Sequence, residues 1–222
     1  MLRIAGVPAG SRVCDVGAGV AHLTLKLAER GFEVDAVEPN DAMRANGVRR
    51  TEALPNVRWF EGTGEATGMA DGVYALVTFG SSFNVCDRPR ALKETARILS
   101  PRGWFACMWN HRELDDPIQC RIEEIIRDDI PGYGYGTRRE DQTAVIAESG
   151  LFEDAVTVSG RVVHAQTKAD CVEAWRSHAT LERQAGERFG AIVDNISGYL
   201  DGLPGDSIQV PYRTNIWIAR LR

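Results

Sequence analysis

The sequence is first informative through what it lacks. Its 222 residues contain no uninterrupted apolar run near the roughly 18 to 20 residues that a membrane-spanning helix needs, which excludes such a helix. The first eight residues lack the apolar block of a secretory signal. Positive charge is not in surplus either, because 26 Lys and Arg face 31 Asp and Glu, for a net charge of −5. We therefore expect a cytoplasmic protein whose partners include neither a membrane nor a nucleic acid.

The five cysteines lack the spacing of a metal site or a redox pair. None of them forms a C-x-x-C pair, and Cys14 and Cys107 lie inside apolar runs. We expect reduced, mostly buried thiols. No cluster of Cys and His has the spacing of a zinc site, so no metal is predicted. With 44% hydrophobic and 26% charged residues, the chain can bury a core, and its length fits one α/β domain.

Short apolar runs alternate with helical patterns through the first half of the sequence. The strands are expected at Arg12–Val16, Glu33–Val37, Val57–Glu61, Val73–Phe79 and Trp104–Trp109. The helices between them are expected at Ala21–Arg30, Asp41–Arg50 and Arg88–Leu99, the last of these ending at a turn formed by residues 100–103. This β-α-β-α order predicts a mostly parallel sheet with helices on both faces.

The second half is less regular. Helices are expected at Asp116–Ile130, Glu140–Ser149, Ala169–His178 and Glu182–Leu200. Strands are expected at Ala155–Ala165, bent at Gly160, and at Ile208–Leu221, broken early by Pro211. No repeat or linker separates the two halves, so we expect one domain over residues 1–222.

The turn after the first strand carries the strongest functional signal. Gly17 and Gly19 follow a strand and precede a helix, where a glycine-rich backbone can approach a ligand closely. The third glycine of the dinucleotide fingerprint is replaced by His22, and that glycine serves packing near a pyrophosphate. Glu38 ends the second strand, where an acid can bind both ribose hydroxyls. The pattern therefore predicts an adenosine ligand without a diphosphate.

Four segments together resemble a known family. Asp15–Gly19, Val37–Met43, Gly62–Ala66 and Leu99–Trp104 look like the motifs of class I S-adenosylmethionine-dependent methyltransferases. The stretch from Gly64 to Arg112 is similar to the branch that acts on small molecules, which includes proteins like trans-aconitate methyltransferase. The resemblance implies a Rossmann-like, doubly wound α/β fold: a seven-stranded, mostly parallel sheet with an antiparallel last strand in three α/β/α layers. It also implies a cofactor-binding half at 1–112 and an acceptor-binding half, with lid elements, at 113–222.

The resemblance implies S-adenosyl-L-methionine as the cofactor and assigns roles around it. Asp15 would order the glycine turn, Glu38 would hold the ribose, and Phe79 and Gly80 would flank the methionine portion. Thr63 stands where many members carry an acid, so the contact with the adenine amino group is left open between Thr63 and Glu65. The residues implied to bind the cofactor are Asp15, Gly17, Ala18, Gly19, Glu38, Pro39, Met43, Thr63, Gly64, Glu65, Phe79 and Gly80.

Residues for the acceptor are predicted from their places near strand ends and in loops. Ser81, Ser82 and Asn84 follow the fourth strand, and either serine or Asn84 is a candidate to bind the acceptor. His111 follows the fifth strand, at the same sheet edge, and is a candidate acceptor contact or catalytic base. Tyr133 and Tyr135 lie in a glycine-rich loop, which is read either as a lid over the acceptor or as a mobile surface segment. His178, late in a polar helix, is the remaining candidate.

Methyl transfer from a sulfonium is an in-line displacement with an activated leaving group. The protein mainly has to align the acceptor and exclude water, and a base is needed only for an acceptor that loses a proton. The expected function is methyl transfer to a small-molecule hydroxyl, carboxyl or amine, and a residue usage typical of high-GC bacteria points to specialised metabolism. The alternatives are a non-catalytic protein that binds the same cofactor and a nicotinamide-dependent oxidoreductase. A homodimer is left open, and the short segment before the first strand predicts an open cofactor site.

Overall fold

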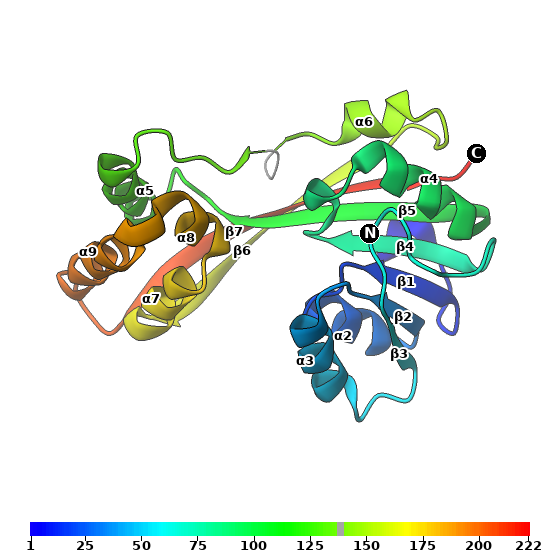
Figure 1. The fold of residues 1–222 in the computed structure, drawn as a ribbon, viewed down its shortest axis with the longest axis horizontal. Coiled ribbons are helices and arrows are strands. Elements are labelled where there is room, and N and C mark those ends of the chain that lie inside the picture. Colours follow the sequence, from blue (N-terminus) through cyan, green and yellow to red (C-terminus); the bar gives the residue numbers. More distant parts are fainter. Residues whose placement is uncertain (137–139) are drawn as a thin grey trace. The chain divides into compact units, whose positions relative to one another are not determined.

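The computed structural model describes residues 1–136 and 140–222. The chain forms two compact units (Figure 1). The core unit consists of Met1–Trp109, Glu140–Ser159 and Asn215–Arg222. The helical unit consists of Asn110–Arg139 and Gly160–Thr214. The first boundary lies near the predicted one at residue 112, but the chain then returns to the core unit twice. No helix in the described ranges is long and apolar enough to cross a membrane.

A seven-stranded sheet has the order β3-β2-β1-β4-β5-β7-β6, which confirms the predicted Rossmann-like fold. Strands β1 to β4, together with the core part of β5, pair in parallel. Backbone bonds join Leu221 to Gly103 at one end of β7 and Glu113 to Pro211 at the other, so β7 runs antiparallel to β5. The strands are β1 (Arg12–Val16), β2 (Glu33–Val37), β3 (Val57–Phe60), β4 (Tyr74–Gly80), β5 (Leu99–Arg112), β6 (Val156–Thr167) and β7 (Ser207–Arg220).

Nearly all of the expected helices form, with ends shifted by a few residues. They are α2 (His22–Ala28), α3 (Asp41–Thr51), α4 (Arg88–Ile98), α5 (Pro117–Asp129), α6 (Thr143–Glu148) and α7 (Lys168–Arg176). Two short elements were not expected: α1 (Leu2–Ala5) and the 3-10 turn η1 (Phe83–Val85).

Three details differ from the sequence prediction. The single helix expected at Glu182–Leu200 is wrong: the chain forms α8 (Ala179–Ala185), the 3-10 turn η3 (Gly186–Arg188) and α9 (Phe189–Asp201), with Gly186 at φ 55. The turn expected at residues 100–103 is an irregularity within β5, since Tyr74 pairs with Leu99 but Leu76 pairs with Trp104. Pro211 does not break β7, because its carbonyl still accepts the Glu113 N–H.

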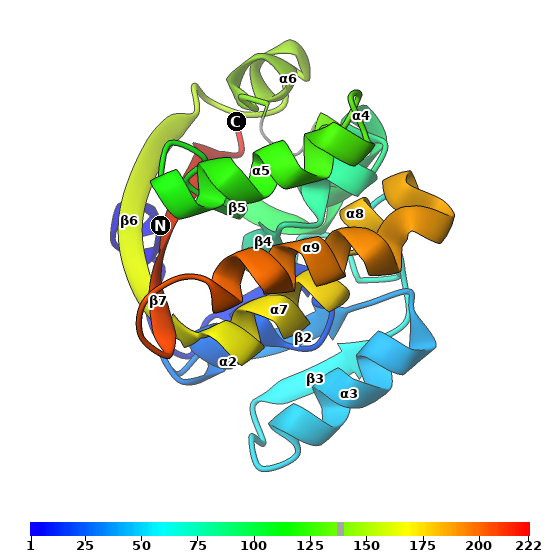
Figure 2. The same cartoon turned by 90° about the vertical axis from the view of Figure 1, so that its left-hand side faces the viewer.

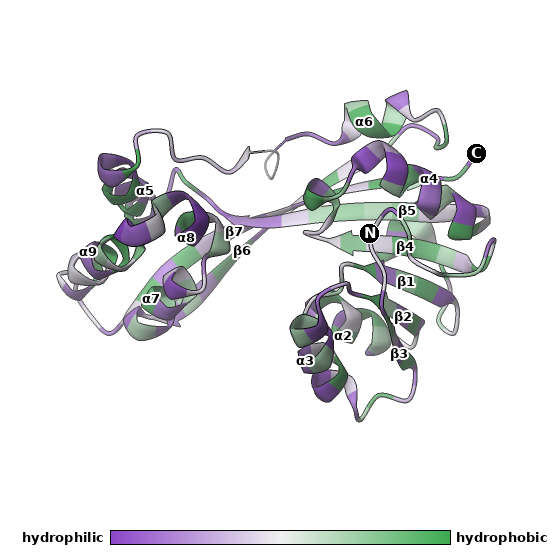
Figure 3. Cartoon of the chain, viewed as in Figure 1, coloured by the Kyte–Doolittle hydropathy of each residue, from purple (hydrophilic) through white to green (hydrophobic). Residues whose placement is uncertain are grey.

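The core unit has a hydrophobic cluster on each face of its sheet. Neighbouring strand residues point to opposite faces, so Val13 and Leu76 pack on one side while Cys14 and Val77 pack on the other. Helices α1 and α2 cover the first face, and α4 and α6 cover the second. Figure 3 shows the apolar residues along β1 and β4 that this burial on both faces requires. The result is the expected three-layer arrangement.

Candidate active site

The glycine turn after β1 lies where the carboxyl ends of three parallel strands meet. Gly17 and Gly19 have φ values of 66 and 57, a region that favours glycine. A Cβ added at Gly17 would also collide with Ser82, whose hydroxyl donates to the Val16 carbonyl at 2.5 Å. The turn and the segment after β4 are therefore packed against each other, and only a residue without a side chain fits at position 17.

Glu38 is fixed by the backbone around it. Glu38 is only 5% exposed. Its carboxylate accepts a hydrogen bond from the Gly19 N–H at 2.8 Å and one from the Asn40 N–H at 2.9 Å. A carboxylate offers about four lone-pair sites, so these two bonds leave room for further donors. The geometry orients the acid toward the turn and keeps acceptor sites for a pair of hydroxyls.

Asp15 is buried at the end of β1 and bonded on both oxygens. The Thr24 hydroxyl donates to it at 2.7 Å and the Thr78 hydroxyl at 2.9 Å, which ties β1 to α2 and β4. Burial raises the pKa of Asp15 to about 6, although the two threonine bonds work in the opposite direction. The charge of Glu38 adds a smaller upward contribution to the same pKa.

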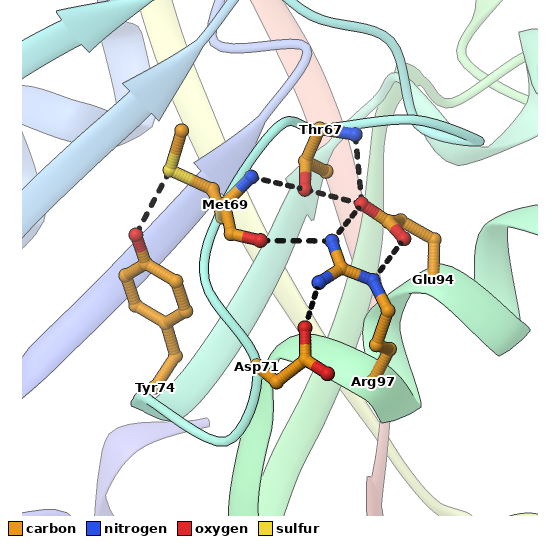
Figure 4. A network of polar contacts seen from close by, with 6 residues as sticks. All are labelled: Thr67, Met69, Asp71, Tyr74, Glu94 and Arg97. Carbon is orange, nitrogen blue, oxygen red and sulfur yellow. Dashed lines mark hydrogen bonds and ion pairs between the residues drawn. The ribbon is translucent and has the colours of Figure 1, made fainter.

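The loop between β3 and β4 is held by a polar network that includes Glu94 and Arg97 of α4 (Figure 4). Glu94 of α4 accepts the Thr67 N–H at 2.8 Å and its hydroxyl at 2.5 Å, and Arg97 donates to the Met69 carbonyl at 2.8 Å. Burial acts to raise the pKa of Glu94, but the bonds from Arg97 and Thr67 lower it to about 2. These contacts fix the loop that carries Thr63, Gly64 and Glu65.

Glu65 has a structural bond that the sequence did not indicate. Its carboxylate accepts the Asp87 N–H at 2.6 Å, just before α4 begins. Beside it, Gly64 is buried, and a Cβ there would collide with the Cys86 thiol. Glu65 thus holds the start of α4, and Thr63 is left as the more exposed of the two candidates for an adenine contact.

These elements enclose a cavity of about 610 Å³, within the usual range for a small-molecule site. Every residue predicted to bind the cofactor lines it except Phe79. The Phe79 ring is fully buried and packs against Phe83 and Phe105, and its place beside the methionine portion stays a prediction. The lining residues are Asp15, Val16, Gly17, Ala18, Gly19, Val20, His22, Leu23, Glu38, Pro39, Met43, Thr63, Gly64, Glu65, Gly80, Ser81, Ser82, Val85 and Cys86.

Sequence reasoning missed the cavity wall formed after β4. Val85 is 73% exposed and lines the cavity together with Cys86. Ser82 also lines it, but its hydroxyl is already bonded to a backbone carbonyl. Ser81, in contrast, is exposed and has an unusual positive φ of 75. Val85 lies five residues after the end of β4, and nothing in the sequence marked it as exposed. Asn84 is half-buried in η1 and is absent from the cavity lining.

Three of the predicted acceptor residues come together within the helical unit. The Tyr133 and Tyr135 rings are 5.4 Å apart, and the Tyr135 ring is 6.4 Å from that of His178. Tyr133 is only 5% exposed, which contradicts its reading as a surface residue. His178 caps α8, where its Nδ1 accepts the Leu181 N–H at 3.2 Å, so its neutral form carries the proton on Nε2. His111 is partly buried near the end of β5, and its role as a base stays a prediction.

No group of three His, Cys, Asp or Glu side chains in the described part of the chain could hold a metal ion. All five cysteines are unpaired, and Cys14, Cys107 and Cys171 are buried. The cavity residues instead fit an adenosine-containing cofactor. Gly17, Ala18 and Gly19 bring the backbone of the turn to the cavity, and the remaining acceptor sites of Glu38 suit ribose hydroxyls.

Comparisons with known proteins agree with this fit. Residues 14–107 match the model of a methyltransferase domain family, described as "Methyltransferase domain". An uncharacterised methyltransferase of Mycobacterium tuberculosis is 37% identical over 109 residues, which cover 47% of this chain and 42% of that protein. A ubiquinone/menaquinone biosynthesis C-methyltransferase of Zymomonas mobilis is 30% identical over 148 residues, 60% of this chain and 61% of that protein. The chain thus spans less than two thirds of the length of these curated relatives.

A solved structure supports the same fold. A putative type II methyltransferase from Anaeromyxobacter dehalogenans superposes with a TM-score of 0.68 at 19% identity, over 100% of this chain and 94% of that chain. At this identity the likeness concerns the fold. Together with the domain match, the comparisons support S-adenosylmethionine as the cofactor. The small-molecule branch stays a prediction.

Proposed function

We propose that the chain transfers the methyl group of S-adenosylmethionine to a small-molecule acceptor carrying a hydroxyl, carboxyl or amine. The observation that carries the proposal is the buried Glu38, which is held by the Gly19 N–H beside a cavity of about 610 Å³. The net charge of −5 supports a small molecule over a nucleic acid as the acceptor. The assignment to bacterial specialised metabolism rests on residue usage and belongs to the same proposal.

When bound, S-adenosylmethionine supplies an activated methyl group on a sulfonium sulfur. Glu38 would accept the ribose hydroxyls, and the Gly17–Gly19 backbone would lie beside the cofactor. Pro39 and the half-exposed Met43 would offer apolar surface to the adenine ring. Asp15 holds the turn through its two threonine bonds rather than through contact with the acceptor.

Each unit has its own candidate acceptor residues. Ser81, Ser82 and Asn84 are the candidates after β4, and the exposed Ser81 is favoured over Ser82, whose hydroxyl is already bonded. Tyr133, Tyr135 and His178 supply polar and aromatic groups in the helical unit. For an acceptor that must lose a proton, His111 is the proposed base.

Calorimetric titration tests the cofactor assignment. S-adenosylhomocysteine should bind and NADH should not; binding of NADH alone would replace the proposal with an oxidoreductase. Glu38→Gln should weaken S-adenosylhomocysteine binding by about 10- to 100-fold, the loss expected for hydrogen bonds to a charged group. The matched control is Glu33→Gln, an exposed glutamate at the other end of the same strand, which should bind as the wild type does.

Transfer itself requires a separate measurement. Incubation with methyl-labelled S-adenosylmethionine and a bacterial metabolite extract should move the label into a small-molecule product. Tight cofactor binding without transfer across a broad extract would instead favour a non-catalytic, cofactor-binding protein.

A further inference from the structure

The helical unit has its own hydrophobic core, into which several polar side chains are sealed. Helix α9 packs against α5, α7 and α8, and Figure 2 shows these four helices side by side. Most of the side chains between them are aliphatic. Against this background, Gln119 is 1% exposed, Thr180 2% and Glu123 4%. A core built only for stability would place apolar groups at such positions.

Several polar atoms in this core have neither a hydrogen bond nor an ion pair among the residues that the structure describes. They are both amide atoms of Gln119, the indole nitrogen of Trp175 and the hydroxyl oxygen of Thr180. Burying a polar group without a partner is unfavourable, and each such group in a folded protein needs a physical reason. A polar occupant that bonds to these atoms is such a reason.

Hydrogen-bond and ring contacts link most of these residues into one group of side chains. Gln119 and Glu123 are four residues apart on α5 and so share a face of that helix. The Tyr135 hydroxyl donates to Glu123, and burial, followed by the charges nearby, raises the pKa of Tyr135 above its ordinary value. The Tyr135 ring is next to that of His178. We call the whole group the polar–aromatic cluster: Gln119, Glu123, Tyr135, Trp175, His178 and Thr180.

The other side of the cluster is joined through the same histidine. The His178 ring is 4.9 Å from the Trp175 ring, and Thr180 follows two residues later in the first turn of α8. The Arg112 guanidinium stacks over Trp175 at 4.4 Å. The unpartnered atoms therefore lie on three helices that the aromatic residues connect.

The chemistry of the cluster selects one kind of occupant. Tyrosine, tryptophan and histidine rings favour a flat ring as a neighbour. The Gln119 amide offers a donor and an acceptor, the Trp175 N–H a donor, and the Thr180 hydroxyl either, which suits hydroxyl groups on that ring. The Glu123 carboxylate forms an ion pair with the Arg127 guanidinium at 3.5 Å, so it does not require a bound ion as its partner.

We propose that the polar–aromatic cluster binds a hydroxyaromatic molecule. We identify this molecule with the methyl acceptor. That identification rests on the proposed function, whereas the binding of the molecule to the cluster does not. Opening of the cluster around the ring brings its hydroxyls to Gln119, Trp175 and Thr180, which then gain the partners that they lack.

Titration with a matched pair of probes tests the ligand class. Catechol has a flat ring with two neighbouring hydroxyls, and trans-cyclohexane-1,2-diol has the same hydroxyls without the flat ring. We expect catechol to bind calorimetrically with a Kd of about 1 mM or tighter, a normal affinity for a molecule of its size. The cyclohexane diol should bind at least tenfold more weakly. Equal binding of both probes, or none by catechol, overturns the proposal.

Substitution of the unpartnered groups gives a second readout that a structural role would not produce. Gln119→Leu and Thr180→Val should weaken catechol binding by tenfold or more and also raise Tm, by about 2 to 4 °C each. The matched control is Gln142→Leu in the core unit. Gln142 is fully buried but bonded to Arg88 and Glu140, so its loss should lower Tm. A lower Tm or unchanged catechol binding in Gln119→Leu contradicts the proposal.

The same samples separate this inference from the proposed function. S-adenosylhomocysteine should bind to Gln119→Leu as to the wild type, because its cavity is lined by core-unit residues. Binding of S-adenosylhomocysteine without catechol overturns only the acceptor site. Binding of catechol without S-adenosylhomocysteine overturns only the methyl-transfer function.

Discussion

The two units differ in the partners of some of their most deeply buried polar side chains. In the core unit, the buried carboxylates have defined partners: Asp15 accepts from two threonines, Glu38 from two backbone N–H groups, and Asp35 from Arg12, Arg58 and Tyr74. In the helical unit, Gln119 and Thr180 are equally buried but have no partner in the described chain.

This difference indicates two kinds of binding site. The cofactor cavity is already organised, because its key side chains are held by the protein itself and need not reorder when a ligand binds. In the polar–aromatic cluster, the missing hydrogen bonds of Gln119, Trp175 and Thr180 form only when a ligand binds. A cofactor shared by many reactions suits the first arrangement, and a specific acceptor suits the second.

The largest effect is expected where the organised site leaves no space. In Gly17→Ala, the new Cβ is strained by the positive φ and also overlaps Ser82. We expect a loss of about 4 kcal/mol in the free energy of unfolding, from the left-handed conformation and from overpacking together. Binding of S-adenosylhomocysteine should fall at least 100-fold, measured by calorimetry alongside urea denaturation.

Gly19→Ala is the control for that substitution. Gly19 also has a positive φ, but an added Cβ would meet no atom within 4 Å. Its cost should be limited to about 1 to 2 kcal/mol of backbone strain. Equal losses in the two variants would show that the contact with Ser82 does not organise the turn.

The next effect concerns Asp15 and depends on pH. Because burial raises the pKa of Asp15 to about 6 from an ordinary 3.8, the folded state favours the protonated acid. Its stabilising contribution is therefore complete below about pH 4 and is lost as the pH rises through 6. The difference should approach roughly 3 kcal/mol at pH 7.5.

Asp15→Asn removes this titration and so provides the measurement. The free energy of unfolding of the wild type, relative to the variant, should fall between pH 4.5 and 7.5 in urea denaturation. A constant difference across that range would mean that Asp15 stays ionised in the folded protein. The threonine bonds, which favour the charged form, would then outweigh the effect of burial.

Much of the core unit could be predicted because its signals are local. The strands around Asp15 and Glu38 are short apolar runs, and the Gly17–Gly19 turn has a recognisable spacing. The sequence did not indicate that the Phe79 side chain would be fully buried, because its ring joins an aromatic cluster contributed by distant segments. Nor did the sequence indicate that Glu65 would bond to Asp87, 22 residues away.

The helical unit was harder to predict, since its features depend on packing. The break at Gly186 was not apparent within a long polar helical pattern. Gln119 gave no signal in the sequence, because a glutamine on a helix is normally exposed, and only the packed structure shows it to be sealed. Tyr133, Tyr135 and His178 were each singled out, but their contacts could not be deduced from their spacing.

The smallest effect is expected at Met43, and it tests whether this exposed side chain contacts the bound cofactor. Met43 lines the cavity and is 46% exposed, so its side chain gains contacts only when the cofactor covers it. Met43→Ala should weaken S-adenosylhomocysteine binding about tenfold, from lost apolar contact, with the free energy of unfolding changed by less than about 0.5 kcal/mol.

Val48→Ala is the matched control, because Val48 lies on the same helix, is 44% exposed and does not line the cavity. It should leave both quantities unchanged. If Met43→Ala bound as tightly as Val48→Ala, the adenine ring would not lie against α3, and the cofactor's orientation in the cavity would have to be reversed.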